Sequence, residues 1–130
     1  MLLIRAYLED NTMLKFICYP KCSTCRKAQM WLDANKIEYE FRDIKLSNPS
    51  LEELTEWHKK SGLPLKKFFN TSGLLYKSFD LKNKLPTMTD DEMLNLLASD
   101  GMLVKRPLVI GGSFVLVGFK EAEWSEALSK

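Results

Sequence analysis

Two cysteines, Cys22 and Cys25, are separated by two residues near the start of the chain. An apolar run over residues 14–19 precedes them, and a helical pattern follows from Arg26 onward. The first turn of a helix carries unpaired backbone N–H groups and partial positive charge, so a sulfur held there is favoured as the thiolate. A thiolate attacks disulfides and oxyanions. The pattern therefore predicts a reactive thiol.

Charge and helical spacing suggest different roles for the two cysteines. Apolar residues recur at helical spacing from Cys25, which predicts that Cys25 faces the core while Cys22 stands at the exposed start of the helix. We therefore expect Cys22 to attack the substrate and Cys25 to resolve the covalent intermediate as a Cys22–Cys25 disulfide. We also expect Arg26 to help bind an anion. The positive side chains beside the pair are Lys21, Arg26 and Lys27.

Other interpretations of the pair remain to be weighed. A zinc site needs two more ligands, and the chain offers Cys18 and His58 outside any second paired motif, so no metal is expected. A structural disulfide is disfavoured because a four-residue loop constrains little of the unfolded chain. Two small residues at a helix start, without a redox role, remain an open alternative. Cys18 itself is expected to pack as a small core residue.

Length and charge limit the classes of protein. The 130 residues, 45% of them hydrophobic, predict one domain over residues 13–130. A net charge of +2 argues against direct binding of nucleic acid. Residues 1–12 are too short and too acidic for a signal peptide, and we expect an appended or misannotated start, a disordered extension or a surface turn of helix. No stretch reaches the length of a membrane span, so a cytoplasmic protein is expected.

The reactive pair is predicted to lie in a βαβ unit. The apolar run 14–19 is predicted as a buried strand, the following helix ends near Asn35, and residues 37–44 alternate as a second strand. Two strands joined by a helix are expected to run parallel. The cysteine loop then lies outside the carboxyl end of the first strand, where open α/β sheets place their sites.

The rest of the chain predicts a helical region followed by a hairpin. Residues 47–101 are expected to be largely helical, with two capping boxes. A glycine turn joins strands at 108–110 and 114–117, and a last helix is expected over 120–128. The capping boxes are Ser50 with Glu53 and Thr89 with Glu92.

Arg106 and Pro107 stand directly before the hairpin. A proline at the first residue of a strand wastes no hydrogen-bond donor of the sheet, which is one explanation of Pro107. Arg106 is permanently charged and has five donors, so it would suit an oxyanion or a thiolate if it faced the Cys22 loop. Its position in the sequence leaves both interpretations open.

Four stretches of the chain, taken in their order and spacing, carry a family resemblance. Together they resemble the ArsC/Spx family of thioredoxin-fold proteins over residues 14–128, nearest to the arsenate-reductase-like branch. Each alone is weak, because CxxC occurs in many unrelated folds. The stretches are 19–28, 68–73, 104–110 and 117–119.

The resemblance implies a fold and a neighbour for the cysteine. The implied fold is α/β and thioredoxin-like, with a four-stranded mixed sheet and a helical insertion at about residues 47–101. It also implies that Pro107 is a cis-proline packed opposite the reactive cysteine, which brings Arg106 to the site.

The resemblance further implies an oxyanion site, from which this chain departs. In arsenate reductases of this type, the cysteine that matches Cys22 attacks the oxyanion, and a serine matches Cys25. Three arginines surround the anion there. Arg106 matches one of them, Lys66 falls near the second, and Gly118 takes the third position.

We therefore expect a thiol oxidoreductase similar to arsenate reductase, acting on a small oxyanion or a disulfide. No bound cofactor is expected; a thiol reductant, either glutathione with glutaredoxin or thioredoxin, would serve as co-substrate. Thioredoxin suits an internal disulfide because its reduction potential is low, about −270 mV. The alternative is a redox-sensing regulator similar to Spx, which binds the C-terminal domain of the RNA polymerase α subunit. A third alternative is an interaction module without activity.

Overall fold

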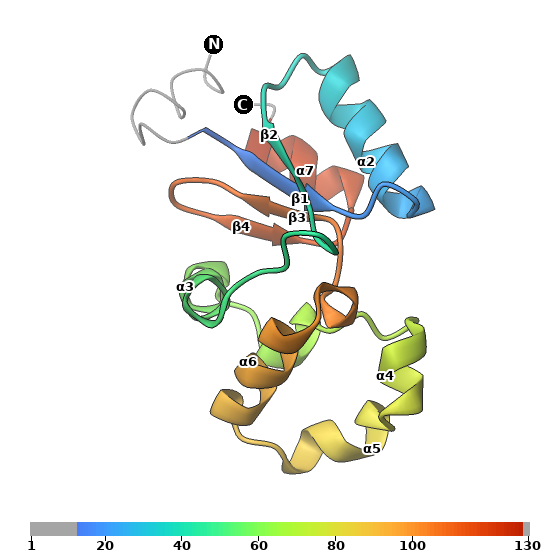
Figure 1. The fold of residues 1–130 in the computed structure, drawn as a ribbon. Coiled ribbons are helices and arrows are strands. Elements are labelled where there is room, and N and C mark those ends of the chain that lie inside the picture. The colour runs from blue at the N-terminus through green and yellow to red at the C-terminus, as the bar shows by residue number, and fades with distance from the viewer. Residues whose placement is uncertain (1–12, 129–130) are drawn as a thin grey trace. The chain divides into compact units, whose positions relative to one another are not determined.

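The computed structural model describes residues 13–128, and these divide into two compact units. The first contains the described residues up to Arg42 together with those from Arg106 onward, and the second is Asp43–Lys105 (Figure 1). The expectation for residues 1–12 lies outside the described residues. Among the residues described, no helix is long and apolar enough to cross a membrane.

The first unit is built on a four-stranded mixed sheet with strand order β2-β1-β3-β4. Strands β1 and β3 are antiparallel, as are β3 and β4, so the mixed sheet requires β2 to run parallel to β1. The predicted mixed sheet, with its parallel pair and its C-terminal hairpin, is confirmed. The strands are β1 (Lys15–Cys18), β2 (Glu40–Asp43), β3 (Leu108–Ile110) and β4 (Val115–Val117).

Helices α2 (Ser23–Ala34) and α7 (Glu121–Leu128) pack with β1 and β3 around one hydrophobic core. Trp124 of α7 is fully buried in it and makes edge-on ring contacts with Phe16 and Phe119. Its indole N–H donates to the carbonyl oxygen of Gly118 at 3.0 Å, which satisfies the polar end of a buried tryptophan. The buried members of this core are Leu14, Phe16, Cys18, Cys25, Ala28, Leu32, Ile37, Val109, Trp124 and Leu128.

The second unit is helical, as the sequence predicts for this region. Both capping boxes are present, since the side chains of Ser50 and Thr89 each accept from the backbone N–H three residues on. Gly62 ends α3 in the left-handed region at φ 69°, which glycine adopts at little cost. The elements are α3 (Leu51–Ser61), η1 (Leu65–Phe68), α4 (Leu74–Ser78), α5 (Leu81–Lys84), η2 (Leu85–Thr87), α6 (Asp90–Ser99) and η3 (Gly101–Leu103).

Backbone hydrogen bonds tie the middle of the second unit to its end. Asn70 donates to the carbonyl of Leu103 at 2.8 Å, and Lys105 donates to that of Phe68 at 2.7 Å. Phe68, predicted as a core residue on a short helix over 63–69, is fully buried at the end of η1. The helical region is therefore stabilised within itself and has its own core.

Candidate active site

Cys22 lies at the mouth of α2. It is the N-cap residue, with an extended backbone at φ −87° and ψ 126°, and the N–H of Arg26 donates to its carbonyl oxygen at 3.1 Å. The side chain is partly exposed and its thiol is free, whereas Cys25 is buried in the core. The predicted division between an exposed Cys22 and an inward Cys25 is confirmed.

The surroundings of Cys22 favour the thiolate. Partial burial raises the pKa of the thiol, but the backbone N–H of Cys25, the Arg106 guanidinium and the N–H of Thr24 outweigh it, and the pKa is lowered. A lowered pKa makes a partly exposed thiol reactive near neutral pH.

Arg106 is the cation at this site. Its guanidinium carbon lies over the ring of Tyr19, 5.4 Å from the ring centroid, and its side chain lowers the pKa of Cys22 by hydrogen bonding and by charge. Its Nε and Nη1 atoms are buried, and neither has a hydrogen-bond partner among the described residues. Buried polar groups are almost always paired, so two unpaired donors beside a thiol indicate a place for an acceptor.

The peptide bond between Arg106 and Pro107 is cis. The resemblance implies this, and the structure confirms it. Gly118 donates its N–H to the carbonyl of Pro107 at 2.8 Å. The hairpin thus holds the segment that carries Arg106.

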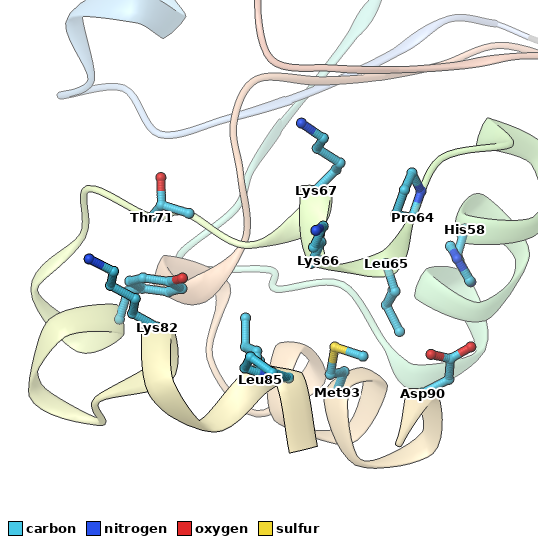
Figure 2. Close-up of a pocket in the computed structure, with 12 residues that line it drawn as sticks. His58, Pro64, Leu65, Lys66, Lys67, Thr71, Lys82, Leu85, Asp90 and Met93 are labelled. Carbon is cyan, nitrogen blue, oxygen red and sulfur yellow. The ribbon is translucent and has the colours of Figure 1, made fainter. Parts of the chain in front are cut away.

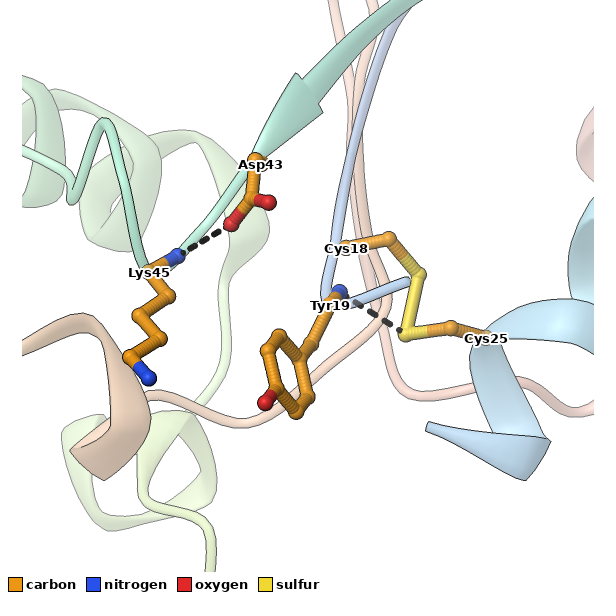
Figure 3. The surroundings of a disulfide bond; sticks show 5 residues. All are labelled: Cys18, Tyr19, Cys25, Asp43 and Lys45. Atoms are coloured by element: carbon orange, nitrogen blue, oxygen red, sulfur yellow. Dashed lines mark hydrogen bonds between the residues drawn. A yellow bond between two sulfur atoms is a disulfide. The ribbon is translucent and has the colours of Figure 1, made fainter. Parts of the chain in front are cut away.

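Cys18 and Cys25 form a disulfide, which corrects the expectation that Cys18 only packs in the core (Figure 3). Cys18 ends β1 and Cys25 lies in the first turn of α2, with 5.8 Å between their Cα atoms, a usual separation for a disulfide. The Cys22–Cys25 bond expected for the catalytic intermediate is not the bond present here. The reason is that Cys25 faces the core, where the end of β1 meets it.

Comparison with known proteins agrees with this geometry. The sequence profile of the ArsC family matches residues 17–127. The chain belongs to the ArsC family. Members of this family include arsenate reductases and Spx regulators, and the ArsC neighbours share the mixed-sheet, thioredoxin-like fold described above.

Two bacterial relatives and one solved structure illustrate the range of the ArsC family. YusI of Bacillus subtilis (strain 168) is 55% identical over 113 residues, which cover 87% of this chain and 96% of YusI. Regulatory protein MgsR of the same organism is 29% identical over 110 residues, 85% of this chain and 86% of MgsR. The crystal structure of a possible arsenate reductase from Streptococcus mutans UA159 has 47% identity and a TM-score of 0.82, covering 92% of this chain and 100% of that one.

Two further residues, Arg26 and Lys66, are predicted from the sequence to bind the anion. Arg26 is exposed on α2, and it is not among the groups that lower the pKa of Cys22. Lys66 belongs to the second unit, where it lines a pocket of about 650 Å³ with His58, Tyr76 and Met93 (Figure 2). A role for either residue in anion binding stays a prediction.

Two residues of the candidate site are not predicted as such from the sequence. Tyr19, whose ring lies beneath the Arg106 guanidinium carbon, carries no signal of this contact in the sequence. Cys18 lies in an apolar strand, and the sequence predicts only a core residue there. The feature of the sequence that could have predicted the disulfide is the position of Cys18 at the end of the strand. A short loop brings the end of a strand close to the first turn of the helix that follows it.

Proposed function

We propose that this ArsC-family protein is a thiol oxidoreductase. Cys22 attacks an oxyanion or a disulfide, Arg106 holds the anionic substrate, and Cys25 resolves the covalent intermediate. The observation that carries this proposal is the free thiol of Cys22 at a helix start, next to a guanidinium with two buried and unpaired donors. Helix N-terminal amides share the negative charge of such a substrate.

The chemistry balances as follows when arsenate is the substrate. The Cys22 thiolate bonds to arsenic and displaces hydroxide, which is protonated to water. The Cys25 thiolate then attacks the Cys22 sulfur; an S–S bond forms, and the electron pair of the S–As bond passes to arsenic, which leaves as arsenite. Two thiols have lost two electrons and arsenic has gained them. Cys25 must start each cycle as a thiol, so a reductant is required.

The proposed reductant and the proposed cellular location of the protein follow from this disulfide chemistry. An internal disulfide is reduced by a dithiol such as thioredoxin or by glutathione with glutaredoxin. Both belong to reducing compartments, so we propose that the protein acts in the cytoplasm. Within the anion site, Lys66 and Arg26 are proposed as further cationic groups and Pro107 as a structural residue.

Alkylation of the reduced protein tests this proposal. Iodoacetamide would be added at fixed pH with and without arsenate, and mass spectrometry would locate the label on each cysteine. We expect Cys22 to react first and arsenate to slow its labelling. Arg106→Met should lose that protection, whereas the exposed Arg26→Met should lose less of it. If arsenate and disulfide compounds leave the labelling of Cys22 unchanged, the proposal is wrong.

A second candidate is a redox-sensing regulator, favoured by the similarity to the regulatory protein MgsR. In this candidate the cysteines control binding to the C-terminal domain of the RNA polymerase α subunit and no substrate is turned over. A pull-down with that domain, on the reduced and the oxidised protein, decides between the two. Absence of binding in both redox states would eliminate the regulator.

A further inference from the structure

We propose that Cys18 is a second resolving cysteine, which displaces Cys22 from Cys25 and stores the oxidation in the buried Cys18–Cys25 disulfide. The inference rests on the proposed function, in which Cys22 attacks and Cys25 resolves. Its new content is that the cycle does not stop at a Cys22–Cys25 bond. The disulfide is transferred from the Cys22–Cys25 pair to the buried Cys18–Cys25 pair, and Cys22 becomes a free thiol again.

The arrangement of the three cysteines supports a relay. Cys25 is bonded to the buried Cys18, and it lies three residues after the partly exposed Cys22, in the first turn of the same helix. Cys18 is 1% exposed and Cys25 is 3% exposed, whereas Cys22 is open to solvent in part. A substrate in solution therefore reaches Cys22 first, and Cys18 can be oxidised only through a neighbouring sulfur.

Each step balances for a disulfide substrate RS–SR. The Cys22 thiolate attacks it, forming Cys22–SR and releasing one RS⁻. The Cys25 thiolate attacks the Cys22 sulfur, forming Cys22–Cys25 and releasing the second RS⁻. The Cys18 thiolate then attacks the Cys25 sulfur, forming Cys18–Cys25 while Cys22 leaves as a thiolate. Both RS⁻ groups take up protons released by Cys18 and Cys25, so two thiols are oxidised and one disulfide is reduced.

The direction of the last step follows from the surroundings of the two end cysteines. In thiol–disulfide exchange, a thiol with a low pKa is the faster leaving group. Exchange therefore favours the disulfide in which the thiol with the low pKa is free. The Arg106 guanidinium and the helix amides stabilise Cys22 as the departing thiolate. The N–H of Tyr19 donates to the Cys25 sulfur at 3.3 Å, which holds that sulfur at the end of β1 beside Cys18 (Figure 3).

Tryptic mapping can separate the two disulfides because a cleavage site lies between Cys18 and the other two cysteines. Cleavage after Lys15, Lys21 and Arg26 places Cys18 on one peptide, and Cys22 with Cys25 on the next. A Cys22–Cys25 bond closes a loop within one peptide, whereas Cys18–Cys25 links two peptides. Fragmentation of the linked pair shows which of the two cysteines is joined to Cys18.

The experiment uses fully reduced full-length protein and one equivalent of oxidised glutathione, quenched at a series of times with acid and then alkylated. We expect glutathione on Cys22 first, then the internal loop, and finally the linked pair with Cys22 alkylated. Cys18→Ala should stop at the loop and leave Cys22 protected. Cys22→Ser should form the linked pair more than about tenfold more slowly, because its entry thiol is gone.

The outcomes distinguish the inference from the function on which it rests. If the wild-type protein ends as the Cys22–Cys25 loop, the relay is wrong and the proposed function stands. If the linked pair forms as fast in Cys22→Ser, oxidation does not pass through Cys22 and the relay is again wrong. If Cys22 takes up no glutathione and the linked pair does not form in the wild-type protein, the relay is wrong; the proposed function fails with it only if arsenate also leaves the labelling of Cys22 unchanged. If Cys18→Ala does not fold, the time course of the wild-type protein alone tests whether the relay operates.

Discussion

The Arg106 guanidinium makes a cation–π contact with the ring of Tyr19, with 5.4 Å between the guanidinium carbon and the ring centroid. Sheet register explains this contact. Ile17 of β1 pairs with Leu108 of β3 in an antiparallel ladder, and two further residues along that register bring Tyr19 opposite Arg106. The Arg106 side chain also hydrogen bonds with Cys22, while its Nε and Nη1 atoms are buried without a partner among the described residues.

Replacing Arg106 by methionine should raise the pKa of Cys22, because a hydrogen bond and a positive charge that favour the thiolate are lost. The rate of Cys22 alkylation against pH measures this pKa. We expect a midpoint below that of a free cysteine in the wild-type protein, a higher midpoint in Arg106→Met, and labelling at pH 7 slower by severalfold. Arg26→Met serves as the control and should move the midpoint less. Equal shifts in both variants would contradict the role given to Arg106.

The same lowered pKa makes stability depend on pH. Because the pKa of Cys22 is lower in the folded protein than in the unfolded chain, ionised Cys22 stabilises the fold. This contribution is complete above the unfolded pKa and is lost as the pH falls through the folded pKa. We therefore expect the free energy of unfolding of the reduced protein to exceed that of reduced Cys22→Ser more at high pH than at low pH, in urea titrations. A constant difference across pH would argue against it.

Reduction of the Cys18–Cys25 disulfide should depend on Cys22. Both bonded cysteines are buried, so an external thiol reaches them only after Cys22 has attacked Cys25 and returned the bond to the surface. In Cys22→Ser, oxidised beforehand under denaturing conditions and refolded, reduction by dithiothreitol should be more than about tenfold slower than in the wild-type protein. Both proteins should be reduced at similar rates in denaturant, which is the matched control. Similar rates under native conditions would show that the buried bond is attacked directly.

Replacing Trp124 by phenylalanine should destabilise the first unit. The change keeps an aromatic ring but removes the N–H that donates to Gly118, leaving a carbonyl in a buried residue without that donor. We expect a loss of about 1–3 kcal/mol in the free energy of unfolding, measured by urea denaturation. Trp31→Phe, at a partly exposed position in the same cluster, is the control and should cost less. Equal losses would mean that the hydrogen bond contributes little.

Replacing Gly101 by alanine should destabilise the second unit. A Cβ there would collide with the carbonyl oxygen of Ile44, and a backbone atom cannot move aside as a side-chain end can. We expect a cost of about 1–3 kcal/mol in urea denaturation, typical of overpacking. Gly62→Asn is the control, because nothing lies within 4 Å of its Cβ position and asparagine tolerates a positive φ. A cost at Gly101 no larger than at Gly62 would contradict the clash.

Features set by neighbouring residues could be predicted from the sequence. The capping boxes at Ser50 and Thr89 depend on contacts three residues apart, and both are present. The exposed position of Cys22 and the inward position of Cys25 follow from the period of one helix. The short helices α4 and α5 were harder to predict individually, since neither has a side-chain cap and α5 begins after Asp80 in the left-handed region.

Features set by distant segments could not be predicted from one sequence. The contact of Tyr19 with Arg106 depends on the register of β1 with β3, which hydrophobic pattern alone does not fix. The pairing of Cys18 with Cys25 depends on which end of the strand meets the helix, and a cysteine in an apolar run resembles any other small core residue. The family resemblance supplied the cis peptide before Pro107 and the place of Arg106 at the site.

The first unit is discontinuous, with Cys22 in its leading segment and Arg106 in its trailing one. A ribosome therefore completes the cysteine loop long before it makes the arginine that stabilises the thiolate. Until β3 has been made and pairs with β1, only the N–H groups of the helix start favour the Cys22 thiolate. A truncated or stalled chain therefore lacks the arginine contribution to the reactivity of Cys22.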